Sequence, residues 1–114
     1  MTISLREQFG EFALSADQGR CLGEQVREAL QGGEVSVLDF AGIRSVISAF
    51  LNPAIGELYG TFPADVVDDR VRVINASPVQ EQSVELVRSN ARRYYHDPEF
   101  RRAQDAALEE LFSD

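Results

Sequence analysis

The sequence predicts one small α/β domain, with a mixed sheet of short strands and helices packed against it. The chain has 114 residues, which is the usual size of a single domain. Segments with alternating or continuous apolar residues, typical of strands, are separated by segments whose apolar residues recur at helical spacing. Strands that alternate with helices form parallel neighbours through right-handed crossovers, so we expect parallel strands within the sheet.

The first half of the chain contains two predicted strands, one uncertain segment and one helix. Residues 2–5 alternate polar and apolar, as a short strand does, and "EFALS" at residues 11–15 is either a second short strand or a bend. Ser15 followed by Gln18 has the pattern of a capping box and predicts a helix start, and Gly32-Gly33 predicts its end. The segment "EVSVLDF", residues 34–40, predicts a strand covered on both faces.

A connecting turn at residues 41–46 leads to a helix whose start is ambiguous. One start has Ser48 as the N-cap, so that Pro53 distorts the first turns. The other has Asn52 as the N-cap and Pro53 as the first helical residue, which leaves residues 48–51 as an exposed loop. Gly60 and Pro63 end this helix in either case.

The remaining elements are a strand and two helices. "RVRVIN" at residues 70–75 alternates as a strand does, and Ser77, Pro78 and Gln80 predict a capped helix that ends before Asp97-Pro98. We therefore divide the chain into a domain at residues 1–97 and a helical extension at residues 98–114. The extension has an apolar face that must pack on the domain or on another copy, formed by Phe100, Ala103, Ala107, Leu111 and Phe112.

Composition and charge narrow the classes of partner. The net charge is −8, which disfavours nucleic-acid backbones and anionic lipid surfaces as partners. Acidic residues are interleaved with the late arginines, which we interpret as a solvated helix face: Arg88, Arg92, Arg93, Arg101 and Arg102. No apolar run approaches the roughly 20 residues that span a bilayer, and the N-terminus lacks a secretory pattern, so we expect a cytoplasmic protein without membrane contact.

The sequence offers few groups for catalysis or metal binding. His96 is the only histidine, and its place before Asp97-Pro98 is typical of a helix end. Cys21 is the only cysteine, and we expect it to pack against the domain. A catalytic site needs a nucleophile, a base and an orienting group that converge. We therefore expect no enzymatic activity, no metal and no cofactor.

Function is more plausible at the carboxyl ends of the strands, where parallel sheets place their binding sites. Asp39 and Asn75 are at the ends of two predicted strands, and Ser77 follows Asn75. Asp39 has a second interpretation, in which it accepts backbone N–H bonds in the next turn. The segment after the first of these strands supplies further candidates for partner binding: Ser48, Phe50, Leu51 and Asn52.

Several short motifs resemble the STAS domain, the fold of bacterial anti-sigma factor antagonists. They are the strand "VSVLDFAGIRSV", the serine that follows it, and "VRVINASP". More closely, "LDFAG", "SAFLNPAIGELYG", "NARRYY" and an early Phe9-Gly10 resemble the STAS-like family of unknown function DUF4325. The resemblance implies a STAS-like fold over about residues 1–95. In STAS antagonists the serine that corresponds to Ser48 is phosphorylated by a partner kinase.

The resemblance also implies the kind of function. We expect a regulatory module that binds a protein partner, a histidine-kinase-like ATPase or an anti-sigma factor, with Ser48 as the phosphorylation candidate. Ile47 and Phe50 stand where antagonists have an aspartate and a glycine, so the loop itself differs. Two alternatives stay open: a domain that senses a small ligand or nucleotide, and a structural subunit that forms homo-oligomers.

Overall fold

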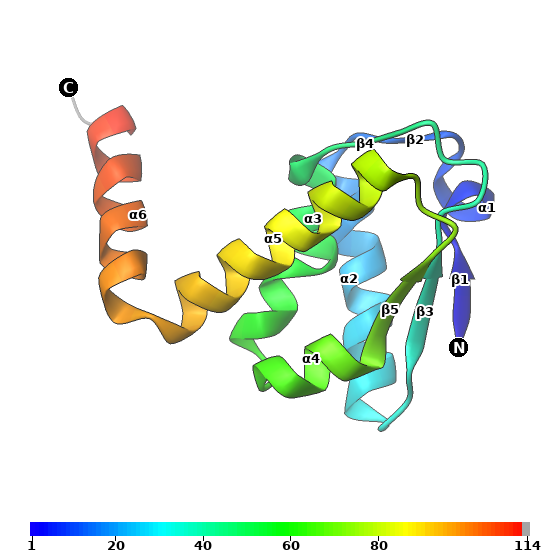
Figure 1. The fold of residues 1–114 in the computed structure, drawn as a ribbon, viewed down its shortest axis with the longest axis horizontal. Coiled ribbons are helices and arrows are strands. Elements are labelled where there is room, and N and C mark those ends of the chain that lie inside the picture. Colours follow the sequence, from blue (N-terminus) through cyan, green and yellow to red (C-terminus); the bar gives the residue numbers. More distant parts are fainter. Residues whose placement is uncertain (113–114) are drawn as a thin grey trace.

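The computed structural model describes residues 1–112, and it describes only the backbone of Phe100 and of residues 108–112. Figure 1 shows short strands at one end of the molecule and helices beside them. In chain order the elements are β1 (Thr2–Ser4), α1 (Leu5–Phe9), β2 (Phe12–Ala13), α2 (Ala16–Gln31), β3 (Ser36–Asp39), β4 (Ser45–Val46), α3 (Ser48–Ala54), the 3-10 helix η1 (Gly56–Gly60), α4 (Ala64–Arg70), β5 (Val71–Ile74), α5 (Pro78–His96) and α6 (Pro98–Phe112).

The described strands form two small sheets, and every pair of neighbouring strands in them is parallel. The larger sheet has the order β1-β3-β5, with Thr2 beside Val37 and Ser36 beside Val71. The smaller sheet pairs β2 with β4, so "EFALS" does contain a short strand. The α/β class and the parallel neighbours are confirmed, whereas the expectation of a mixed sheet is not met by the described strands.

Helix caps confirm most of the predicted boundaries. The Ser15 side chain accepts the Gln18 amide at the start of α2, and Gly32 follows its last residue. At the start of α5, Ser77 and Gln80 cap each other reciprocally, with Pro78 as the first helical residue. The chain adds α1, β4 and α4, which the periodicity did not predict because each is seven residues or shorter. The helix expected to end at Gly60 ends at Ala54, and the 3-10 helix η1 occupies residues 56–60.

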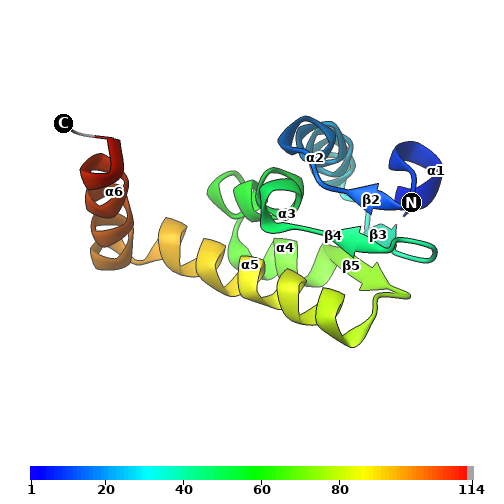
Figure 2. The ribbon, with the colours of Figure 1, turned by 90° about the horizontal axis from the view of Figure 1, so that it is seen from above.

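Helices cover one face of the larger sheet. Figures 1 and 2 show α2, α3, α4 and α5 on the same side of β1, β3 and β5. The burial pattern agrees, since Ile3, Leu38 and Val71 are almost completely buried, whereas Thr2 and Arg72 on the other face are exposed. The core therefore lies between the sheet and the helices, around large side chains that are nearly inaccessible: Tyr59, Phe40, Phe50, Leu22, Leu51, Ile55 and Leu58.

Helices α2 and α3 approach each other at backbone distance, and two glycines of α2 make this possible. An ideal Cβ on Gly23 would lie 2.4 Å from the carbonyl oxygen of Pro53, and one on Gly19 would lie 2.2 Å from that of Phe50. The Pro53 ring also faces Gly19, because that same Cβ would lie 2.7 Å from its Cγ. The proline thus lies inside α3 but one residue from its end, where the missing N–H costs a single hydrogen bond.

The predicted C-terminal helix is present as α6, and it projects from the far end of α5 (Figure 1). The Tyr94 hydroxyl donates to Asp105 Oδ1 at 2.9 Å, and the Arg101 guanidinium lies 5.3 Å from the Tyr94 ring centre. Ala103 and Ala107 are exposed, so the domain does not cover this part of the expected apolar face. The other members of that face, Phe100, Leu111 and Phe112, have side chains outside the described residues, as do residues 113–114.

Candidate functional site

Ser48 is the first residue of α3, and its predicted role as N-cap is wrong. Ile47 occupies the N-cap position and makes no side-chain cap, while its carbonyl accepts the amides of Phe50 and Leu51. The Ile47 amide bonds to the Ala13 carbonyl at 3.3 Å, which keeps Ile47 extended beside β2. The helix therefore starts at the next residue, Ser48, one residue earlier than a Ser48 cap would give. Ser48 is exposed, and its hydroxyl makes no hydrogen bond to the described part of the chain.

An apolar patch adjoins Ser48, and the two short strands create it. Phe12 lies beside Ser45 and Ala13 beside Val46 in the parallel register, which brings Leu14 next to Ile47. Ala13 is fully buried, so the alternating side chains of Phe12 and Leu14 point outward. Phe12, Leu14 and Ile47 are 50%, 45% and 41% exposed. We call these three residues together with Ser48 the Ser48 surface.

Two expected partner-binding residues are core residues. Phe50 and Leu51 are both 0% exposed, so the exposed loop over residues 48–51 is wrong, and so is the helix start at Asn52. The physical reason is that α3 turns these two side chains toward the interior, where the Phe50 ring packs edge-on against Phe9 at 5.7 Å between ring centres. Asn52 is exposed, on the face of α3 that also carries Ser48 one turn earlier.

The carboxyl ends of β3 and β5 bring Asp39 and Asn75 together. Asp39 Oδ1 accepts the Asn75 side-chain amide and the Ala41 backbone amide, each at 2.9 Å. Asn75 has a left-handed backbone with φ of 59°, a conformation that asparagine tolerates better than most residues. The turn-stabilising interpretation of Asp39 is confirmed. In the described residues, neither Asp39 nor Asn75 forms a hydrogen bond with Ser48. The third candidate at these strand ends, Ser77, is the N-cap of α5.

Asp39 should make the stability of the domain sensitive to acid. Its two hydrogen bonds, first that from Asn75 and then that from Ala41, lower the pKa of the carboxyl from its ordinary value. A carboxyl whose pKa is lower in the folded state stabilises that state above the unfolded pKa, and this contribution disappears as the pH falls through the folded pKa. We expect Asp39→Asn to reduce the drop in melting temperature between about pH 5 and pH 3. Thermal melts of both proteins across that range measure it, and parallel curves would contradict it.

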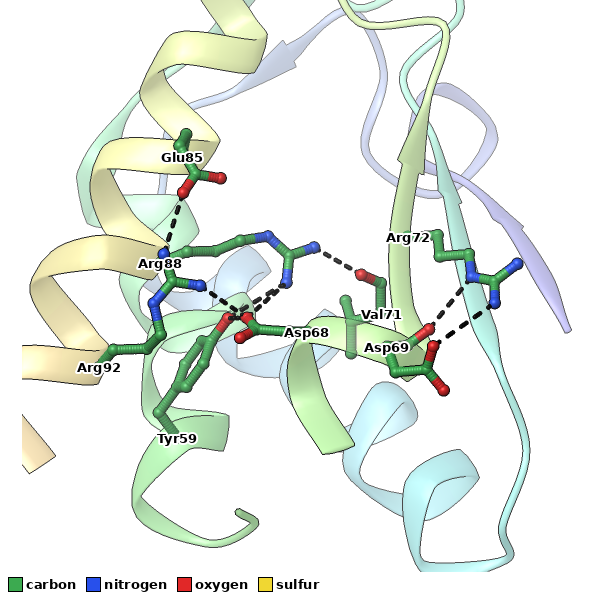
Figure 3. A network of polar contacts seen from close by, with 8 residues as sticks. All are labelled: Tyr59, Asp68, Asp69, Val71, Arg72, Glu85, Arg88 and Arg92. Carbon is green, nitrogen blue, oxygen red and sulfur yellow. Dashed lines mark hydrogen bonds and ion pairs between the residues drawn. The ribbon is translucent and has the colours of Figure 1, made fainter. Parts of the chain in front are cut away.

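A buried polar network joins η1, α4, α5 and β5 (Figure 3). Arg88 is 8% exposed, and it donates to the Tyr59 hydroxyl at 3.2 Å and to the Val71 carbonyl at 2.5 Å. Tyr59 donates to Asp68, which also accepts from Arg92 at 2.8 Å. Burial, followed by the hydrogen bond to Asp68, raises the pKa of Tyr59. The expectation that Arg88 belongs to a solvated helix face is therefore wrong.

The other single-residue predictions have mixed outcomes. Cys21 is exposed and not packed, because α2 turns it away from the stripe that contains Leu22 and Val26. His96 is exposed in the last turn of α5, as expected. Within the described residues, no group of three or more His, Cys, Asp or Glu side chains is arranged to hold a metal ion. No described helix is both long enough and apolar enough to cross a bilayer.

The parallel sheet covered by helices on one face, with a serine at the start of the helix after β4, places the molecule among STAS-like α/β domains. A family model described as a STAS-like domain of unknown function (DUF4325) matches residues 18–81, more than half of the chain. The chain belongs to this family. Comparison with curated proteins and with solved structures found no match. The matched range contains the α2–α3 pair, β3, β4, β5 and the start of α5.

Proposed function

We propose that this STAS-like domain is a non-enzymatic regulatory module that binds a protein partner through the Ser48 surface. Phosphorylation of Ser48 switches this binding. The observation that supports the proposal is the exposed serine beside three exposed apolar side chains, Phe12, Leu14 and Ile47. Contiguous apolar surface is a common mark of protein interaction sites, and the serine lies where a kinase would reach it.

The position of Ser48 suits an added phosphate. At the start of a helix the first backbone N–H groups lack intrahelical partners, here those of Ser48 and Ala49 within the described residues. The positive end of the helix dipole also favours an anion. The cap residue Ile47 supplies no side-chain acceptor for these groups. A phosphate on Ser48 therefore gains local hydrogen bonds while it introduces charge beside the apolar patch. Helix α3 tolerates the modification, and a partner that covers the patch does not.

The family resemblance suggests the class of partner. STAS-type antagonists bind a histidine-kinase-like ATPase or an anti-sigma factor, and the partner kinase phosphorylates the serine that corresponds to Ser48. The segments "VSVLDFAGIRSV" and "VRVINASP", which carry the resemblance to the antagonists, lie within the matched residues. We therefore propose such an ATPase as the partner of this chain, although Ile47 and Phe50 make the loop different from that of the antagonists.

Ser48→Asp should weaken partner binding at least about tenfold, because the carboxylate must lose its hydration against the apolar patch. Ser48→Ala should bind like the native protein, since the Ser48 hydroxyl has no partner within the described residues. The partner is first recovered from the native host with the tagged full chain, and the affinities of purified proteins are then measured by calorimetry. Incubation with the partner and ATP, followed by mass spectrometry, tests phosphorylation of Ser48 directly.

Two controls separate a specific effect from a general one. Gln31→Glu adds the same charge at an exposed position. Gln31 is the last residue of α2, whereas the Ser48 surface lies near the first residues of that helix, so this variant should leave binding unchanged. Phe12→Ser removes apolar area from the Ser48 surface and should weaken binding. If Ser48→Asp and Phe12→Ser both bind like the native chain, the partner uses another surface and the proposal fails.

A further inference from the structure

A cleft lies between the turn that joins α3 to η1, the outer half of α5, and α6. Its volume is about 600 Å³, within the range of sites that hold small ligands or short peptide segments. The described residues that line it come from all three parts: Asn52, Gly56, Glu57, Asn90, Ala91, Tyr94, Tyr95 and Gln104. The Tyr95 ring packs against the Gly60 backbone, since a Cβ added to Gly60 would lie 2.5 Å from Tyr95 Cε1.

Four polar side chains of this cleft have no partners within the described part of the chain. Among the described residues, the side chains of Asn52, Glu57, Asn90 and Gln104 make no hydrogen bond or ion pair, and all four are exposed. Each of the three carboxamides offers two N–H donors and one oxygen acceptor. Tyr94 differs, because its hydroxyl is already bonded to Asp105 and the Arg101 guanidinium lies over its ring.

The charge of the cleft selects against anions. Glu57 is the only charged side chain among its described lining residues, and the chain as a whole carries a net charge of −8. The Glu57 carboxylate is close enough to Tyr95 to contribute, after burial, to the raised pKa of that phenol. A phosphate-bearing ligand would meet repulsion from Glu57, whereas a cation would find that carboxylate and the Tyr95 ring.

We infer that this cleft binds an extended peptide segment that carries an arginine side chain. Carboxamides match peptide groups, since each donates to a backbone carbonyl and accepts from a backbone amide. Glu57 pairs with the guanidinium, which also lies over a tyrosine ring as guanidinium groups commonly do. The inference goes beyond the proposed function, because none of the lining residues belongs to the Ser48 surface.

The test titrates the ¹⁵N-labelled full chain with the tripeptide acetyl-Gly-Arg-Gly-amide and follows the side-chain NH₂ signals by NMR. We expect saturable shifts of the Asn52, Asn90 and Gln104 signals. Acetyl-Gly-Glu-Gly-amide, the acidic counterpart, should leave them in place. Glu57→Gln keeps the shape of the side chain and removes its charge, and it should weaken binding of the arginine peptide about fivefold.

Glu24→Gln is the matched control, because Glu24 is exposed on α2 and loses the same charge. This variant should bind like the native chain. Three results would overturn the inference: no saturation up to the solubility limit of the peptide, equal shifts with the acidic peptide, or equal losses in Glu57→Gln and Glu24→Gln. None of these results bears on Ser48, so the proposed function is tested separately.

Discussion

Gly23→Ala should lower the free energy of unfolding by about 2 kcal/mol, because the new methyl group would overlap the α3 backbone. The Cβ would lie 2.4 Å from the Pro53 carbonyl oxygen, so the two helices must move apart. Alanine also gains about 1 kcal/mol of helix propensity over glycine, and the clash must exceed this gain. Urea denaturation of the full chain measures the difference, with the circular dichroism of the helices as the signal.

Gly32→Ala provides the matched control at the end of the same helix. Its φ is −82°, and its nearest neighbour would lie 3.5 Å from the new Cβ, an ordinary contact. This variant should be as stable as the native chain or slightly more stable. If Gly23→Ala and Gly32→Ala unfold at the same urea concentration, α2 and α3 are not in backbone contact.

Arg88→Met should cost about 3 kcal/mol, because methionine keeps the apolar stem and removes the buried guanidinium. The Tyr59 hydroxyl and the Val71 carbonyl would each lose a donor. A buried polar group without a partner costs about 1–3 kcal/mol. Thermal and urea unfolding both report the loss, and near-ultraviolet circular dichroism shows whether Tyr59 keeps its environment.

Arg72→Met is the matched control. It makes the same substitution at an exposed arginine, next to Val71 in β5. Arg72 pairs with Asp69 at 3.9 Å, and both side chains are more than half exposed. Such a pair contributes about 0–1 kcal/mol. A loss in Arg88→Met no larger than that in Arg72→Met would show that the network in Figure 3 adds little to stability.

The sequence predicted the elements that have strong local signals. Helices α2 and α5 each begin at a serine that accepts the amide three residues later, and β3 and β5 have apolar patterns suited to a sheet. The family was also identified from short motifs, and the match to residues 18–81 confirms it. Each of these capping contacts joins residues only three positions apart, so the sequence pattern alone was enough to predict it.

The rest of the site depends on contacts between distant segments. The start of α3 is set by a hydrogen bond from Ile47 to Ala13, 34 residues earlier. The Pro53 ring and carbonyl fit against α2 because Gly19 and Gly23 have no Cβ there. Arg88 is buried because Tyr59 and Val71, 29 and 17 residues away, supply acceptors. None of these partners has a local signal in the sequence, although Gly19 and Gly23, four residues apart, hint at a close helix contact.

The hydrogen bond from Arg88 to Val71 also has a consequence for the behaviour of the protein in concentrated solution. Strand β5 is the last in the order β1-β3-β5, and the Ile74 carbonyl accepts from Phe40, the residue after β3. Val71, three residues before Ile74, therefore directs its own carbonyl away from the sheet. A free strand edge is a template on which another chain can add a strand and begin aggregation. By occupying that carbonyl, Arg88 removes one acceptor from the β5 edge, which should disfavour edge-to-edge association of one molecule with the next.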